Sequence, residues 1–126
     1  MNALVVSAKG TFRALLEISL ESAGFTTTSA VSSKDALLYL REHTPDLIVI
    51  DEEIKGDLAP LDLAWRVKRV KRLKDVPVIF TVTQKNERLE IAARMAKVDA
   101  VLEKPISARD FARFARRTIE LHDKPE

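Results

Sequence analysis

Short apolar runs alternate with stretches of helical periodicity from one end of this chain to the other. The apolar runs predict strands over residues 3–7, 25–29, 47–50, 76–82 and 100–102. Such alternation predicts an α/β domain in which parallel strands are joined by right-handed crossovers and helices cover both faces of the sheet. The unbroken run Leu47-Ile48-Val49-Ile50 is typical of a strand buried on both of its faces.

The helical stretches carry their own start and stop signals. We expect helices over residues 11–23, 32–42, 61–73, 86–97 and 107–121, and a polar tail over residues 122–126. Gly24 stops the first helix, Ser32 caps the second, and Ser107 caps the fifth. Pro60 suits the first turn of the third helix. The inward face of that helix is predicted to consist of Leu63, Val67, Val70 and Leu73.

The length and composition limit the kind of protein. A chain of 126 residues holds one domain of ordinary size, which we place at residues 1–121. The absence of cysteine excludes a disulfide scaffold, a cysteine-ligated metal site and thiol chemistry. No apolar run approaches the roughly 20 residues of a membrane span, and the start has no basic signal-peptide region. We therefore expect a soluble, cytoplasmic protein that does not bind membranes.

Basic charge is concentrated in one segment. Lys and Arg number 21 against 19 Asp and Glu, which gives a net charge of +2. Six of these bases lie between Trp65 and Lys74, where there is no acid, so the other 15 are outnumbered by the acids. The segment is either a solvated helix face or a contact for an acidic surface, in which Trp65 and Arg69 would take part.

Chemistry is expected where the strands end, because ligands of open parallel sheets bind at the carboxyl edge. Asp51 directly follows a buried strand, where a carboxylate is costly unless a cation pairs with it. Lys104 ends the last strand, and Pro105 turns the chain immediately afterwards. We therefore predict an Asp51–Lys104 ion pair, which either serves a functional site or only fixes two loops.

The whole chain resembles the response-regulator receiver domain. The resemblance rests on residues 46–51, Gly56, residues 76–80 and residues 99–105, in this order and spacing. It implies a flavodoxin-like, doubly wound (βα)5 fold whose five-stranded parallel sheet has the order 2-1-3-4-5. It also implies that a histidine kinase or phosphotransferase phosphorylates Asp51, and that Lys104 pairs with the phosphoryl oxygens.

The sequence departs from the family at the metal site. Receivers carry two acidic residues that hold Mg²⁺, and this chain has Ser7 and Ala8 in their place. Asp51 and a loop carbonyl alone suit Mg²⁺ poorly. We assign no metal ligand and no cofactor, unless Glu52 or Glu53 supplies a replacement carboxylate. Both acids are also explained as loop residues that face solvent.

Two further positions depart from the family. Counted back from Lys104, the hydroxyl position of the fourth strand falls on Val82, and its neighbours Thr81 and Thr83 are expected to point away. A shift of one residue would bring Thr83 into place. The usual aromatic residue of the last strand is Val101. The pattern is that of a degenerate receiver, or pseudo-receiver.

We predict a stand-alone receiver module of phosphorelay signalling, which is not an enzyme and has no output domain in these residues. Phosphorylation of Asp51 is expected to be impaired, so that the module acts by binding proteins. The partner is a histidine kinase, a phosphotransferase, a downstream effector or a second copy of the chain. Ile91, Met95 and Val101 are expected to contribute to the partner surface.

Two other functions remain open. A nucleic-acid-binding module would use the basic helix from Trp65 to Lys74. A small anion or nucleotide binder would use the turn from Ser7 to Thr11, where Lys9 precedes a helix N-terminus. That turn lacks the spacing of a P-loop, and an ordinary strand–helix turn with Thr11 as N-cap explains it more simply. We rank both functions below signalling.

Overall fold

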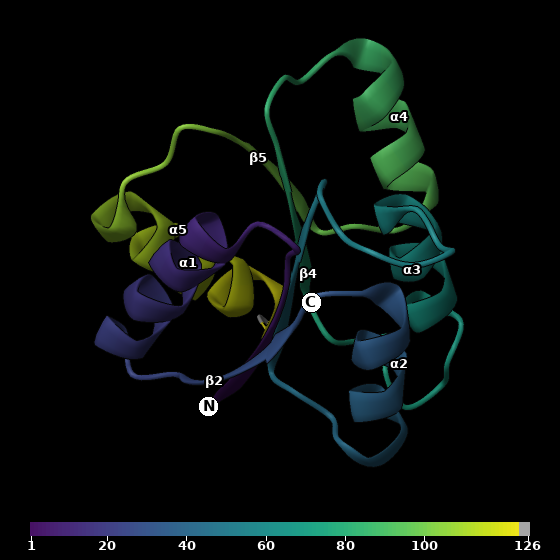
Figure 1. Cartoon of the computed structure of the whole chain (residues 1–126), viewed down its shortest axis with the longest axis horizontal. Helices are drawn as coiled ribbons and strands as arrows, with labels where there is room; N and C mark the ends of the chain where they lie inside the picture. The colour runs from purple at the N-terminus through teal and green to yellow at the C-terminus, as the bar shows by residue number, and fades with distance from the viewer. Residues whose placement is uncertain (124–126) are drawn as a thin grey trace.

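Five strands and five helices alternate along residues 1–123, which are the residues that the computed structural model describes (Figure 1). The strands are β1 (Asn2–Val6), β2 (Thr26–Ala30), β3 (Leu47–Asp51), β4 (Val78–Val82) and β5 (Ala100–Glu103). The helices are α1 (Gly10–Ser22), α2 (Ser33–Glu42), α3 (Pro60–Lys68), α4 (Glu87–Met95) and α5 (Ala108–Asp123). All strand pairs are parallel, in the order β2-β1-β3-β4-β5, which confirms the predicted fold.

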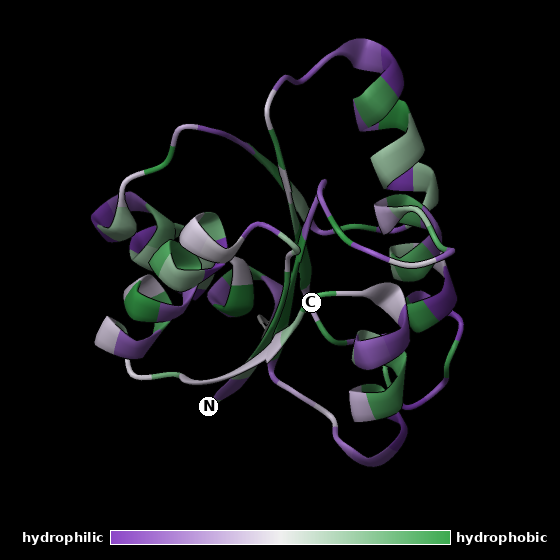
Figure 2. Cartoon of the chain, in the orientation of Figure 1, coloured by the Kyte–Doolittle hydropathy of each residue, from purple (hydrophilic) through white to green (hydrophobic). Residues whose placement is uncertain are grey.

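The sheet separates two apolar layers. Figure 1 shows α1 and α5 on one face of the sheet and α2, α3 and α4 on the other. Because side chains of a strand alternate between faces, Leu4 and Ile48 enter the layer under α2 and α3, whereas Val5 and Val49 enter the other layer. The central strands are accordingly coloured as hydrophobic in Figure 2, whereas most loops are hydrophilic. The two layers hold β3 rigidly, and β3 carries Asp51 at its end.

Local sequence signals predicted most of the helix ends correctly. Ser32 Oγ accepts the backbone N–H of Asp35 at 3.0 Å, and Ser107 Oγ accepts that of Asp110 at 3.1 Å. Gly24 follows α1 with a φ of +97°, a conformation that suits glycine. No helix in the described part of the chain has the length and apolar character needed to cross a membrane.

The third helix is shorter than predicted. α3 ends at Lys68, and the chain continues through i→i+3 turns, such as Arg69 N–H to Arg66 O and Val70 N–H to Val67 O. These turns advance about three residues per turn instead of 3.6, so the inward-facing positions change. Val70 is therefore 40% exposed, and the prediction that it faces inward was wrong, whereas Leu73 is buried as predicted.

Two residues of the basic segment are used inside the domain. The Arg72 guanidinium donates to the carbonyls of Leu40 and His43 at the C-terminal end of α2. Lys68 Nζ donates to the Val76 carbonyl at 2.7 Å and pairs with Asp99. The segment is thus neither the continuous helix nor the uniformly solvated face that its sequence suggests.

Asp99 joins both helical layers at the amino edge of the sheet. Its Oδ2 lies 2.9 Å from Lys68 Nζ of α3 and accepts the backbone N–H of Val78 at 2.7 Å. Its Oδ1 lies 3.3 Å from Nδ1 of His122 in α5. α5 continues to Asp123, two residues beyond its predicted end, and the rest of the predicted tail, 124–126, lies outside the described residues.

Candidate functional site

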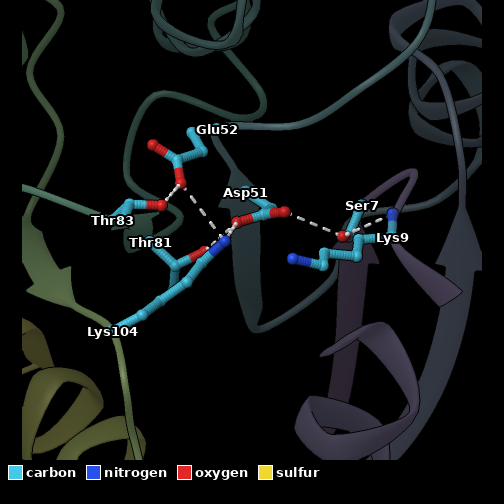
Figure 3. A network of polar contacts seen from close by, with 7 residues as sticks. All are labelled: Ser7, Lys9, Asp51, Glu52, Thr81, Thr83 and Lys104. Carbon is cyan, nitrogen blue, oxygen red and sulfur yellow. Dashed lines mark hydrogen bonds and ion pairs between the residues drawn. The ribbon is translucent and has the colours of Figure 1, made fainter. Parts of the chain in front are cut away.

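Polar side chains from four strand ends meet at the carboxyl edge of the sheet (Figure 3). Ser7 follows β1, Asp51 ends β3, Thr81 lies in β4, and Lys104 follows β5. Parallel strands bring these sequence-distant residues together, since their carboxyl ends share one edge. This is the edge at which the sequence predicted a site.

The Asp51 carboxylate is fully buried, and both of its oxygens are bonded. Lys104 Nζ lies 2.7 Å from Oδ1, which confirms the predicted ion pair. Oδ1 also accepts a hydrogen bond from Thr81 Oγ1 at 2.9 Å, and Oδ2 accepts one from Ser7 Oγ at 3.0 Å. These charge-assisted bonds offset the cost of removing the carboxylate from water.

The hydroxyl beside Asp51 belongs to Thr81, and the assignment of that position to Val82 was wrong. The register pairs Asp51 with Thr81, because it is set by hydrogen bonds between β3 and β4 and not by the distance from Lys104 along the chain. The expectation that Thr81 points away was therefore also wrong. Val82 is buried and offers no polar atom, whereas Thr83 is exposed and bonds to Glu52.

Lys104 has a second acidic neighbour in Glu52. Its Nζ lies 3.4 Å from Glu52 Oε2 and 4.3 Å from the centre of the Phe12 ring. Partial burial would raise the pKa of Glu52, but hydrogen bonds from Thr83 and the charge of Lys104 hold that pKa below its ordinary value. The ammonium group therefore lies among two carboxylates and an aromatic face, with its side chain only 14% exposed.

The remaining predicted loop residues surround this cluster. The Ala8 N–H donates to the Glu53 carbonyl at 2.7 Å, while the Glu53 side chain is exposed. Lys9 contributes its backbone N–H to Ser7 Oγ at 3.2 Å, and its exposed side chain runs in the direction of the site (Figure 3). The bond before Pro105 is cis.

Sequence reasoning missed Arg13 and misplaced the start of the first helix. The Arg13 guanidinium donates to the Ser7 carbonyl at 2.9 Å and so fixes the turn that carries Ser7. α1 begins at Gly10 with Lys9 as its N-cap, without a capping side chain, so Thr11 is not the N-cap. No local pattern identified Arg13, because its contact depends on how the turn folds back on the helix.

The residues at this edge do not fit a magnesium site. Both oxygens of Asp51 are engaged by protein donors, and the Lys104 ammonium lies where it contacts Asp51 and Glu52 together. The Glu53 carbonyl accepts the Ala8 N–H, and the Glu53 side chain is exposed. Within residues 1–123, no three Asp, Glu or His side chains are grouped to hold a metal ion. Mg²⁺ favours carboxylates in a near-octahedral shell, which this donor set does not offer.

The predicted partner residues lie outside this cluster, on two neighbouring helices and a strand. Trp65 of α3 is 50% exposed, and Arg69 lies over its ring at 4.4 Å. Ile91 and Met95 of α4 are 44% and 74% exposed, and Val101 of β5 is half-buried.

A buried aspartate on the central strand of a 2-1-3-4-5 sheet, paired with a lysine after the last strand, defines a signalling domain of the receiver class. A family model supports this assignment independently. The model for the response regulator receiver domain matches residues 3–116. The chain belongs to this family.

Relatives of several kinds share the domain. The phosphate regulon transcriptional regulatory protein PhoB of Pseudomonas aeruginosa is 28% identical over 107 residues, which are 85% of this chain and 46% of PhoB. The polar-differentiation response regulator DivK of Brucella ovis is 30% identical over 92 residues, 73% of this chain and 74% of DivK. The chain spans about half the length of PhoB.

Solved structures give the same fold. The chemotaxis response regulator CheY4 of Vibrio cholerae superposes with a TM-score of 0.86 at 17% identity. The superposition covers 93% of this chain and 97% of CheY4. This likeness establishes the arrangement of the sheet and the helices.

Proposed function

We propose that the chain is a stand-alone receiver module of two-component signalling that acts through contacts with other proteins and is impaired in Mg²⁺-dependent phosphorylation. Asp51 is its candidate phosphoacceptor, and Lys104 is the partner of that carboxylate. The module has no catalytic turnover of its own and works in the cytoplasm. A histidine kinase, a phosphotransferase, a downstream effector or a second copy of the chain would bind it.

The observation that carries this proposal is the state of Asp51. Its side chain has no solvent exposure, and its two oxygens accept three bonds from Ser7, Thr81 and Lys104. An attacking oxygen must leave such a network before it can reach a phosphoryl donor, which adds to the barrier. The charge of an incoming phosphoryl group also needs neutralisation, for which the site offers ammonium groups and no metal ligand set.

The Asp51–Lys104 ion pair gives the module its proposed mode of action. Lys104 Nζ lies 2.7 Å from Asp51 and 3.4 Å from Glu52, so it joins the ends of β3 and β5. Regulation would then come from which partner is bound. The exposed Ile91 and Met95 on α4 are one surface available for such contacts.

The direct test is the intact mass of the protein after incubation with acetyl phosphate, with and without Mg²⁺. We expect little or no phosphoryl adduct under conditions that fully label an ordinary receiver. Asp51→Ala serves as the control that assigns any adduct to Asp51. An adduct that requires both Mg²⁺ and Asp51, formed as fast as in an ordinary receiver, would refute the impairment.

A further inference from the structure

Helix α2 has a second face that the domain covers only in part, since Leu37 on it is half-buried against the core. Its buried side consists of Ser33, Ala36 and Leu40. A separate stripe at i, i+3, i+4 and i+7 spacing comprises Lys34, Leu37, Leu38 and Arg41. Leu38 on this stripe is 48% exposed, although its side chain is large and apolar.

This stripe forms one wall of a groove of about 540 Å³. The other wall comes from the loop between β3 and α3, through Gly56, Asp57 and Leu58, and from Arg66 of α3. α2 and α3 lie side by side on the same face of the sheet (Figure 1). The groove is therefore built from two separate stretches of the chain, residues 33–41 and residues 56–66.

The two walls are fixed to each other by backbone bonds. The Ser33 N–H donates to the Lys55 carbonyl, and the Lys55 N–H donates to the Val31 carbonyl, each at 2.9 Å. Gly56 has a φ of +107°, and a Cβ on it would lie 2.5 Å from Ser33 Oγ. The loop can approach α2 this closely because residue 56 is glycine. A groove with walls held in this way is formed before any partner arrives, which lowers the entropic cost of binding.

The lining specifies a complementary partner. Leu37, Leu38 and Leu58 make the apolar part, and three cations, Lys34, Arg41 and Arg66, face a single acid, Asp57. The stripe from residue 34 to residue 41 is about 10 Å long, which equals two turns of a facing helix. We propose that this groove binds a short amphipathic helix of a partner protein, with leucine-type side chains on one side and Asp or Glu along its borders.

The proposal rests on the proposed role of the chain as a protein-binding module, and it names a surface that does not include the Asp51 cluster. The groove and the Asp51 cluster are linked through one loop. The chain that leaves β3 carries Glu52 and Glu53 before it reaches the groove at Gly56. Binding in the groove does not require phosphorylation of Asp51.

The test uses synthetic helical peptides of roughly 14 residues, about four turns, titrated into the ¹⁵N-labelled full chain and followed by NMR. One peptide carries leucines on one face and glutamates elsewhere. A second carries lysines in place of the glutamates, and a third carries alanines in place of the leucines. We expect the Leu–Glu peptide to bind about tenfold or more tightly than either control, with shifts around Leu37, Leu38 and Leu58.

Two exposed positions supply the variants. Leu38→Asp and Arg66→Glu should each weaken binding of the Leu–Glu peptide by about tenfold or more. Ile18→Asp, a matched change at an exposed apolar residue of α1 on the other face of the sheet, should leave it unchanged. Circular dichroism of each variant establishes that it is folded.

Other outcomes would refute the proposal that this groove binds an acidic amphipathic helix. Equal binding of the Lys peptide would show that charge complementarity does not operate. Shifts around Ile91 and Met95 instead would reject the groove while leaving the protein-binding role standing. Concentration-dependent self-association that competes with the peptide would assign the groove to a second copy of the chain and would overturn the proposal.

Discussion

Lys104 Nζ lies 2.7 Å from Oδ1 of Asp51, and the Asp51 side chain has no exposure to solvent. Their strands are not neighbours, because β4 lies between β3 and β5 in the sheet. The lysine therefore reaches across a strand to neutralise a carboxylate that the fold has removed from water. Breaking such a buried pair from one side leaves an uncompensated charge, which costs more than the pair itself contributes.

Lys104→Ala should accordingly lower the free energy of unfolding by about 2–4 kcal/mol. Thr81 and Ser7 still bond to Asp51 in this variant, so the loss should stay below that of a completely unpaired carboxylate. Urea denaturation measures the difference. Lys71→Ala, at an exposed lysine, is the control and should change stability by about 0.5 kcal/mol or less. Equal stability of the two variants would contradict this view of the pair.

Thr81→Val keeps the shape of the side chain and removes the hydroxyl that donates to Asp51. We expect a loss of about 1–3 kcal/mol, since the bond is to a charged group. Thr26→Val is the matched control, because Thr26 is an exposed threonine of β2, away from Asp51 and Glu52. Its effect should be about 0.5 kcal/mol or less. The same denaturation experiment would reject the assignment of Thr81 if the control lost as much.

Replacing Ser7 and Ala8 together with aspartate should restore a magnesium site. Without metal, the new carboxylates repel Asp51 and should lower the melting temperature. Mg²⁺ binds the folded state and should raise it again, whereas the melting temperature of the unchanged protein should not respond to Mg²⁺. Differential scanning calorimetry over a Mg²⁺ series measures both. A strong Mg²⁺ response of the unchanged protein would mean that its own residues hold the ion.

Ionisation of Glu52 should make part of the stability of the folded domain depend on pH. Its folded-state pKa lies below the ordinary value of 4.5, because bonds from Thr83 and the charge of Lys104 outweigh the effect of burial. The stabilisation is thus present above about pH 4.5 and is lost as the pH falls through the lower, folded pKa.

The check compares Glu52→Gln with the unchanged protein between pH 7 and pH 3 by urea denaturation. At pH 7 the variant should be less stable by about 1 kcal/mol or less, as for ion pairs near the surface. The two curves should approach each other toward pH 3. A difference that stays constant over this range would assign the effect of the substitution to something other than ionisation.

Gly56→Ala should destabilise the domain by about 1–3 kcal/mol, because residue 56 has a positive φ and its new Cβ would meet Ser33 Oγ. Adding Ser33→Ala removes the clashing hydroxyl and should recover part of the loss, leaving the backbone strain of about 1 kcal/mol. A double-mutant cycle from thermal unfolding separates the two causes. If the effects of the two substitutions on stability were strictly additive, the contact with Ser33 Oγ would not be the cause of the loss in Gly56→Ala.

Local sequence signals were sufficient for the alternating elements and for the caps at Ser32 and Ser107, because each depends on neighbouring residues. Resemblance to a family supplied the strand order. The Asp51–Lys104 pair was predictable as well, because parallel strands end at one edge and a buried carboxylate needs a cation.

Features that depend on distant parts of the chain were not predictable. The choice between Thr81 and Val82 follows from the register of β4 on β3, which no count along the chain contains. Arg72 was grouped with the exposed bases because its partners are carbonyls of α2, about 30 residues away. Helical periodicity also continued past Lys68, although the backbone there changes to tighter turns.

Asp99 forms a second cluster of polar contacts, at the edge of the sheet opposite to Asp51. It joins Lys68 of α3, the start of β4 and His122 of α5, as Asp51 joins the strand ends at the other edge. A sheet held at both edges resists sliding between β4 and β5. If a partner drew the Lys104 side chain away from Asp51, the loop after β3 would lose its tie to β5, while the backbone bond from Lys104 N–H to the Val82 carbonyl and the contacts of Asp99 would still hold β5 against β4.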